Sequence, residues 1–89
     1  ERPKLEKYIK AGATIVDVRS PQEYREGHID GAINLPVYDI KGNVQNILKD
    51  KNEIVVLYCS GGERSKKAQD KSRKMGYTNV YAVYNGIEE

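Results

Sequence analysis

The chain has 89 residues, which is enough for one small domain with a single hydrophobic core. Apolar residues make up 38% of it and charged residues 31%, a balance that excludes a disordered chain and a membrane-spanning one. Fifteen basic and thirteen acidic side chains give a net charge of +2, too balanced to indicate nucleic-acid binding. We therefore expect neither a nucleic-acid partner nor a membrane partner.

Two elements are expected at the start of the chain. Leu5, Tyr8 and Ile9 recur at helical spacing, which predicts a short helix that stops at Gly12. Residues 14–18 are short and rich in β-branched side chains, as in a strand of a parallel sheet that is buried on both faces.

The next signal is a helix start at residues 20–23. Ser20 is suited to the N-cap, Pro21 to the first helical position and Glu23 to the third, and together they form a capping-box pattern. The helix is expected to run for about two turns, to Gly27. Residues 32–35 then predict a second strand, halted by proline.

The second half of the chain repeats this order. From Ile40, apolar residues recur at i+4, i+7 and i+8, which predicts a helix over 40–48. Residues 54–58 form an apolar run typical of a third strand, and residues 64–75 a polar helix that ends at a glycine. Residues 80–84 read as the last strand, before an Asn85-Gly86 turn. Strands that alternate with helices predict an α/β domain with parallel strands and right-handed crossovers.

Cys59 lies where the third expected strand stops, directly before a short glycine-bearing loop and a helix. Backbone N–H groups and the positive end of a helix dipole stabilise an anion at such a position. They also lower a cysteine pKa and populate the nucleophilic thiolate. We interpret Cys59 as a nucleophile; the alternative is an inert buried thiol.

Cys59 is also the only cysteine, so the chain has no internal disulfide and no internal resolving thiol. This usage fits a reducing compartment, and the cytoplasm is slightly favoured. A signal peptide that had been cleaved would leave no trace in the sequence.

The loop closely resembles that of the single-domain rhodanese-like sulfurtransferases, together with three segments upstream of it. The most specific element is a cysteine with arginine five positions on and serine after it; the others are Asp17-Val18-Arg19, residues 27–32 and Pro36. The resemblance covers residues 14 to 86, and we expect residues 1–89 to form a single rhodanese-like domain. It implies a parallel sheet of about four strands, in the spatial order fourth, third, first, second, flanked by helices on both faces.

The resemblance also implies an activity. In that family the cysteine becomes a persulfide, which accepts sulfane sulfur from a small donor such as thiosulfate and passes it to cyanide or a thiol. Cys59 would be the catalytic sulfur carrier, and no metal or organic cofactor is expected. The substrate-binding cradle would be the backbone of the six residues that follow: Ser60, Gly61, Gly62, Glu63, Arg64 and Ser65.

The side chains of the loop carry separate expectations. Arg64 would support the loop or contact an anionic donor, and Ser65 would donate to the persulfide or, more simply, cap the helix. Gly61 and Gly62 would provide backbone geometry. Glu63 would repel an anion if it pointed inward, which weakens the case for thiosulfate. The basic residues of 64–74 are interpreted mostly as a solvated helix face.

Four further polar residues receive structural interpretations. Asp17 with Arg19 is expected to brace the end of the first strand, and Glu23 to cap a helix. His28, the one histidine, is placed in a turn without a role as a base.

Two other functions remain open. The chain could be a sulfur carrier or regulatory module that acts on a protein partner, including a protein sulfur acceptor. It could also be a cysteine phosphatase or arsenate reductase of the related fold, but those loops have one more residue between cysteine and arginine. The four residues between Cys59 and Arg64 favour sulfur.

Overall fold

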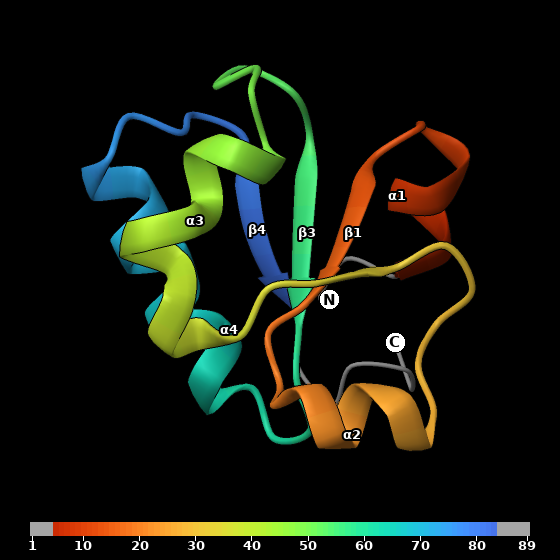
Figure 1. The fold of residues 1–89 in the computed structure, drawn as a ribbon. Helices are drawn as coiled ribbons and strands as arrows, with labels where there is room; N and C mark the ends of the chain where they lie inside the picture. The colour runs from red at the N-terminus through yellow and green to blue at the C-terminus, as the bar shows by residue number, and fades with distance from the viewer. Residues whose placement is uncertain (1–4, 84–89) are drawn as a thin grey trace.

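Four parallel strands form a sheet at the centre of the computed structural model, which describes residues 5–83 (Figure 1). The strands are β1 (Thr14–Asp17), β2 (Ile33–Asn34), β3 (Val55–Tyr58) and β4 (Val80–Val83). Their order in the sheet is β2-β1-β3-β4, as predicted from the resemblance. The winding direction reverses between β1 and β3, and ligands of open α/β sheets bind beyond the carboxyl ends of the strands at such a point.

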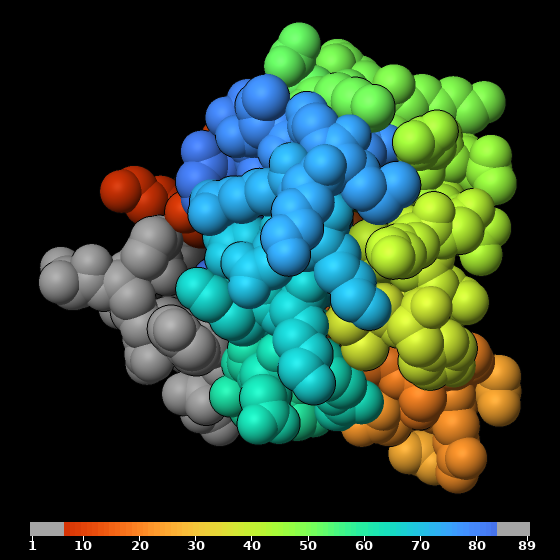
Figure 2. Space-filling model, turned by 90° about the vertical axis from the view of Figure 1, so that its left-hand side faces the viewer, coloured from red at the N-terminus to blue at the C-terminus, as the bar shows by residue number. Residues whose placement is uncertain are grey.

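Helix α1 (Leu5–Lys10) precedes the first strand, and the strands are joined by α2 (Pro21–Glu26), α3 (Ile40–Ile47) and α4 (Glu63–Lys74). Helices α1 and α2 lie on one side of the sheet and α3 and α4 on the other (Figure 1). Figure 2, seen from the second side, shows α3 and α4 packed side by side. The prediction of helices on both faces is therefore confirmed.

Each face of the sheet has its own apolar cluster, because alternate side chains of a strand point to opposite faces. Val16, Val55 and Leu57 pack toward α3 and α4, with Ile40, Val44 and Ala68 among their neighbours. Ile15, Val56 and Tyr58 point the other way, toward Tyr8 and Tyr24. Strands β1 and β3 are thus buried on both faces, as their apolar sequences indicate.

Several details differ from the sequence-based expectation, and most are shifts of one residue at an element's end. Strand β2 is confined to two residues at the edge of the sheet, although the N–H groups of Leu35 and Val37 still donate to the carbonyl oxygens of Asp17 and Val18. A short 3-10 helix, η1 (Val37–Asp39), precedes α3 without having been predicted. Helix α4 begins at Glu63, one residue earlier than expected, and ends at Lys74. The expected Asn85-Gly86 turn lies outside the described residues.

Candidate active site

Cys59 directly follows β3, at the carboxyl edge of the sheet, and only 3% of its surface is exposed. The backbone N–H of Gly62 donates to its Sγ atom at 3.1 Å and that of Ser65 at 3.3 Å. The backbone N–H of Arg64 also acts on the sulfur. The sulfur therefore lies in a concave turn of N–H donors, and these come from Gly62, Arg64 and Ser65 among the six predicted cradle residues.

Gly62 shapes this turn. It is the N-cap residue of α4 and has φ +91°, a left-handed conformation that glycine adopts at little cost. Glycine has no side chain that could cap the helix, so the first N–H groups of α4 lack the partner that an N-cap side chain usually provides. The Cys59 sulfur accepts one of these N–H groups, that of Ser65, instead, and the backbone N–H of Arg64 also lowers the pKa of the thiol. Gly61 has no positive φ, so the expectation of a special backbone need is met at Gly62 alone.

The surroundings of the sulfur act on its charge in opposite directions. Burial raises the pKa of the Cys59 thiol, while hydrogen bonds from the Ser65 side chain and from the backbone of Ser65, Gly62 and Arg64 lower it. The hydrogen bonds outweigh burial, and the pKa of Cys59 lies below its ordinary value. This environment favours the thiolate, the form that attacks sulfur.

Ser65 does not cap α4, contrary to the simpler sequence-based expectation. It is the third residue of the helix, and its Oγ atom lies 3.5 Å from Cys59 Sγ. The hydroxyl also donates to the carbonyl oxygen of Gly62 at 3.1 Å. A hydroxyl can rotate, so Ser65 can accept from a neutral thiol or turn its hydrogen toward a thiolate.

Arg64 supports the loop, as one of the two expectations had it, and its guanidinium binds a carboxylate on another helix. Its Nη1 donates to Glu23 Oε1 at 2.7 Å and its Nη2 to Glu23 Oε2 at 3.2 Å. The side chains are 37% and 35% exposed, so the pair is partly screened by water. The other expectation, contact between Arg64 and an anionic donor, stays a prediction, because Glu23 takes only one N–H donor from each Nη atom of the guanidinium.

Glu23 fulfils its predicted role and has a second one. Its carboxylate accepts from the Ser20 backbone N–H while Ser20 Oγ accepts from the Glu23 N–H, which completes the capping box. The hydrogen bonds from Arg64 are the main cause that lowers the pKa of Glu23 to about 2. The sequence carries no local signal for this pair, because its members are 41 residues apart.

Asp17 and Arg19 form the predicted brace. Asp17 is fully buried and receives Arg19 Nη2 at 2.8 Å, and the same Nη2 donates to the carbonyl oxygen of Gly27 at 2.6 Å. His28 stacks on Tyr24 with ring centroids 3.7 Å apart. These residues hold α2 beside the loop.

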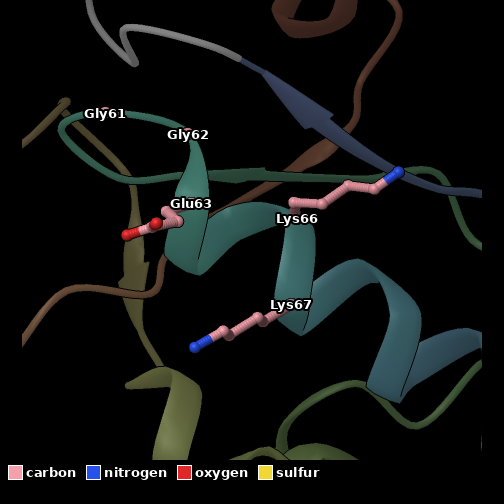
Figure 3. A pocket seen from close by; sticks show the side chains of 5 residues that line it. All are labelled: Gly61, Gly62, Glu63, Lys66 and Lys67. Atoms are coloured by element: carbon pink, nitrogen blue, oxygen red, sulfur yellow. The ribbon is translucent and has the colours of Figure 1, made fainter.

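A shallow hollow lies over the loop and the first turns of α4, lined by Gly61, Gly62, Glu63, Lys66 and Lys67. Figure 3 shows Glu63 and Lys67 extending on one side of α4 and Lys66 on the other. The Glu63 side chain is exposed, so it does not point into the buried sulfur site. Ser60 is exposed as well. The approach to the loop therefore presents two ammonium groups and one carboxylate.

Within residues 5–83 we find no group of three or more potential metal-ligating side chains. None of the helices in that range has the length and apolar character needed to cross a bilayer.

Comparison with known proteins gives a consistent result. The rhodanese-like domain pattern matches residues 1–89. The chain is 40% identical to the thiosulfate sulfurtransferase PspE of Escherichia coli K12, over 73% of this chain and 62% of PspE. It is 36% identical to the thiosulfate sulfurtransferase GlpE of Pseudomonas entomophila, over 86% of this chain and 69% of GlpE.

A solved structure of an E. coli rhodanese with anions superposes with a TM-score of 0.79, at 36% identity, over 85% of this chain and 88% of the other. The chain spans less than two thirds of the length of PspE. Since the family pattern covers the whole sequence, the chain belongs to the rhodanese-like domain family.

Proposed function

We propose that the chain is a sulfurtransferase that carries sulfane sulfur as a persulfide on Cys59, and that residues 1–89 act as one domain. The observation that supports this most directly is the buried Sγ atom held by the N–H groups of Gly62 and Ser65. A persulfide bears its negative charge on sulfur, and a turn of N–H donors stabilises such a charge. We assign the remaining cradle residues, Ser60, Gly61, Glu63 and Arg64, to the same substrate-binding loop.

The reaction has two steps. The Cys59 thiolate attacks the sulfane sulfur of a donor such as thiosulfate; a new S–S bond forms, the donor S–S bond breaks, and sulfite leaves with the bonding electrons. An acceptor, cyanide or a thiolate, then attacks the outer sulfur of the persulfide. That bond breaks toward Cys59, which recovers its thiolate, and the product is thiocyanate or a new persulfide. Charge and electrons balance in both steps without a redox partner.

The acceptor class is a thiophilic small molecule, and a cysteine on a partner protein is the finer possibility. The lysines of the hollow, Lys66 and Lys67, lie beside the loop and would attract an anionic donor or acceptor. The similarity to PspE and GlpE, both thiosulfate sulfurtransferases, supports a small sulfur donor. A protein acceptor would show as persulfide formation without turnover on cyanide.

A cysteine phosphatase is the competing assignment. Four residues separate Cys59 from Arg64, one fewer than in the related phosphatase loops. The N–H groups of the shorter loop converge on a single sulfur, which leaves less room for the three equatorial oxygens of a phosphate. We therefore expect sulfur transfer and negligible hydrolysis of aryl phosphates.

The decisive experiment is intact mass spectrometry after incubation with thiosulfate. The protein should gain the mass of one sulfur atom and lose it again on addition of cyanide, while Cys59→Ser should gain nothing. Absence of the adduct with several sulfane-sulfur donors, or its appearance on the serine variant, would refute the proposal. Phosphatase activity that disappears in Cys59→Ser would transfer the assignment to the phosphatase class.

A further inference from the structure

Helix α2 is six residues long and buries none of its residues completely, so packing alone does not explain its place beside the loop. Polar contacts fix it instead. The capping box of Ser20 and Glu23 closes its first turn, and Arg19 Nη2 reaches the carbonyl oxygen of Gly27 just beyond its last residue. The Tyr24 hydroxyl donates to the carbonyl oxygen of Ala32 at 2.6 Å. Helix α2 is thus held in place by several polar contacts along its length.

Glu23 is the residue of α2 whose side chain contacts the loop. Its Oε1 accepts from the backbone N–H and the hydroxyl of Ser20, both at 3.0 Å, and from Arg64 Nη1 at 2.7 Å. Its Oε2 accepts from Arg64 Nη2 at 3.2 Å. Oε1 thus has partners at the start of α2 and on α4, and Oε2 has one on α4, so the carboxylate is held in one orientation.

Arg64 links this carboxylate to the sulfur. Its guanidinium binds Glu23, while its own backbone N–H and that of the next residue, Ser65, act on Cys59 Sγ. Hydrogen bonds weaken steeply as their angles depart from linearity. A small rotation of the first turn of α4 would therefore weaken several contacts to the sulfur at once.

We infer that Glu23 is a positioning residue for the sulfur site: by binding Arg64 with both carboxylate oxygens, it holds the first turn of α4 where its N–H groups meet Cys59. The inference rests on the proposed role of Cys59 as a thiolate nucleophile. Glu23 makes no contact with the sulfur and acts on it only through Arg64.

The direction in which the pKa of Cys59 changes distinguishes a positioning role of Glu23 from a role of its charge alone and from a role in stability alone. The charged groups near the loop are on α4, on α2 and just before α2: Glu63, Arg64, Lys66, Lys67, Glu23 and Arg19. If Glu23 acted only through its charge, removing that negative charge would favour the thiolate and lower the pKa of Cys59. If it only stabilised the fold, the pKa of Cys59 would not change. If it positions the N–H donors, the pKa of Cys59 rises when it is replaced.

The experiment measures the rate of Cys59 alkylation by iodoacetamide, a neutral reagent, as a function of pH. In Glu23→Gln we expect the midpoint to rise by roughly one pH unit, which is a tenfold change in the ratio of thiolate to thiol. Glu26→Gln is the charge control, since Glu26 lies on the same helix and its carboxylate accepts a hydrogen bond from Gln22. Tyr24→Phe is the stability control, because it removes the hydrogen bond between α2 and the Ala32 carbonyl oxygen and leaves the contacts of Arg64 unchanged. Both controls should keep the parent midpoint.

An unchanged or lower midpoint in folded Glu23→Gln would overturn the inference, and so would an equal rise in Tyr24→Phe. If circular dichroism shows that Glu23→Gln does not fold, Glu23→Asp decides. It keeps the charge on a side chain one methylene shorter, so a raised midpoint supports positioning and an unchanged one refutes it. No sulfur donor is present in these measurements. Their outcome is therefore independent of whether the protein transfers sulfur.

Discussion

At the scale of single residues, the sulfur of Cys59 occupies the place that a serine or aspartate side chain usually takes at a helix N-terminus. It accepts N–H groups from the first turn of α4, while the N-cap residue itself is Gly62. The donors that would otherwise need a cap therefore stabilise negative charge on sulfur. One arrangement begins the helix and favours the thiolate of Cys59.

The contribution of the Ser65 hydroxyl can be measured directly. Replacing Ser65 by alanine removes the side-chain hydrogen bond, the largest of the contributions that lower the pKa of Cys59, and leaves the backbone donors in place. The midpoint of Cys59 alkylation should therefore rise by about half to one pH unit. Ser72→Ala is a matched control, because Ser72 is also buried in α4 but donates to Ala68. A rise of the same size in both variants would contradict the assignment.

Residue-level predictions from the sequence succeeded where the signal is local. The capping box of Ser20 and Glu23 and the Asp17–Arg19 brace each lie within a few residues of chain, and both are present. The pairing of Arg64 with Glu23 was not predicted, because the capping pattern already explained the glutamate and nothing in sequence connects positions 41 residues apart. The sulfur-facing hydroxyl of Ser65 was one of two alternatives, and the simpler one, capping, was wrong.

At the scale of elements, the loop between β3 and α4 depends on one left-handed residue. Gly62 has φ +91°, whereas its neighbour Gly61 has no positive φ and open space where a Cβ would lie. Two adjacent glycines of the same loop thus differ in what they require. The sequence alone could not separate them, since both follow the strand and precede the helix.

This difference predicts opposite outcomes for two alanine substitutions. Gly62→Ala should lower the free energy of unfolding by about 1 kcal/mol or more, because an L-residue is strained in the left-handed region. It should also raise the pKa of Cys59, because the Gly62 N–H donates to the sulfur. Gly61→Ala should change neither quantity appreciably. Urea unfolding and alkylation against pH measure both, and equal effects of the two variants would show that the conformation of Gly62 is unimportant.

Element boundaries were predicted well where two signals coincide. Helix α2 has a capping box at its start and a glycine at its end, and its observed range agrees with both. Strand β2 had only a short apolar run as its signal, and it has two residues instead of the four expected. The 3-10 turn η1 had no periodic pattern of its own, because three residues are too few to show one.

At the scale of the whole molecule, the sheet separates two apolar clusters and places Cys59 and the polar residues around its loop at one edge. Asp17 and Tyr58 end the neighbouring strands β1 and β3 in register, so the residues that follow them meet at the carboxyl edge. The general rule for parallel sheets predicts this edge, and the resemblance supplied the strand order. We therefore expect side chains at the opposite edge of the sheet to contribute to the free energy of unfolding without affecting the pKa of Cys59.

Substitution of Tyr77 tests whether stability at that edge can be lowered without a change at the sulfur site. Tyr77 is 2% exposed, lies just before β4 begins, and donates its hydroxyl to the carbonyl oxygens of Leu48 and, at 3.4 Å, of Val44. Tyr77→Phe leaves these carbonyl groups at the end of α3 without that donor, so the free energy of unfolding should fall by about 1–3 kcal/mol. Tyr38→Phe is the control, because Tyr38 is 65% exposed and water can replace its contacts.

The midpoint of Cys59 alkylation should stay at the parent value in both tyrosine variants, because Tyr77 precedes β4 while Cys59 follows β3, at opposite ends of two parallel strands. Urea unfolding and alkylation against pH, measured on the same preparations, test the two halves of the prediction. A midpoint that moved with stability in Tyr77→Phe would mean that the sulfur site responds to any loss of packing. The specific effects expected for Glu23, Gly62 and Ser65 would then need a different explanation.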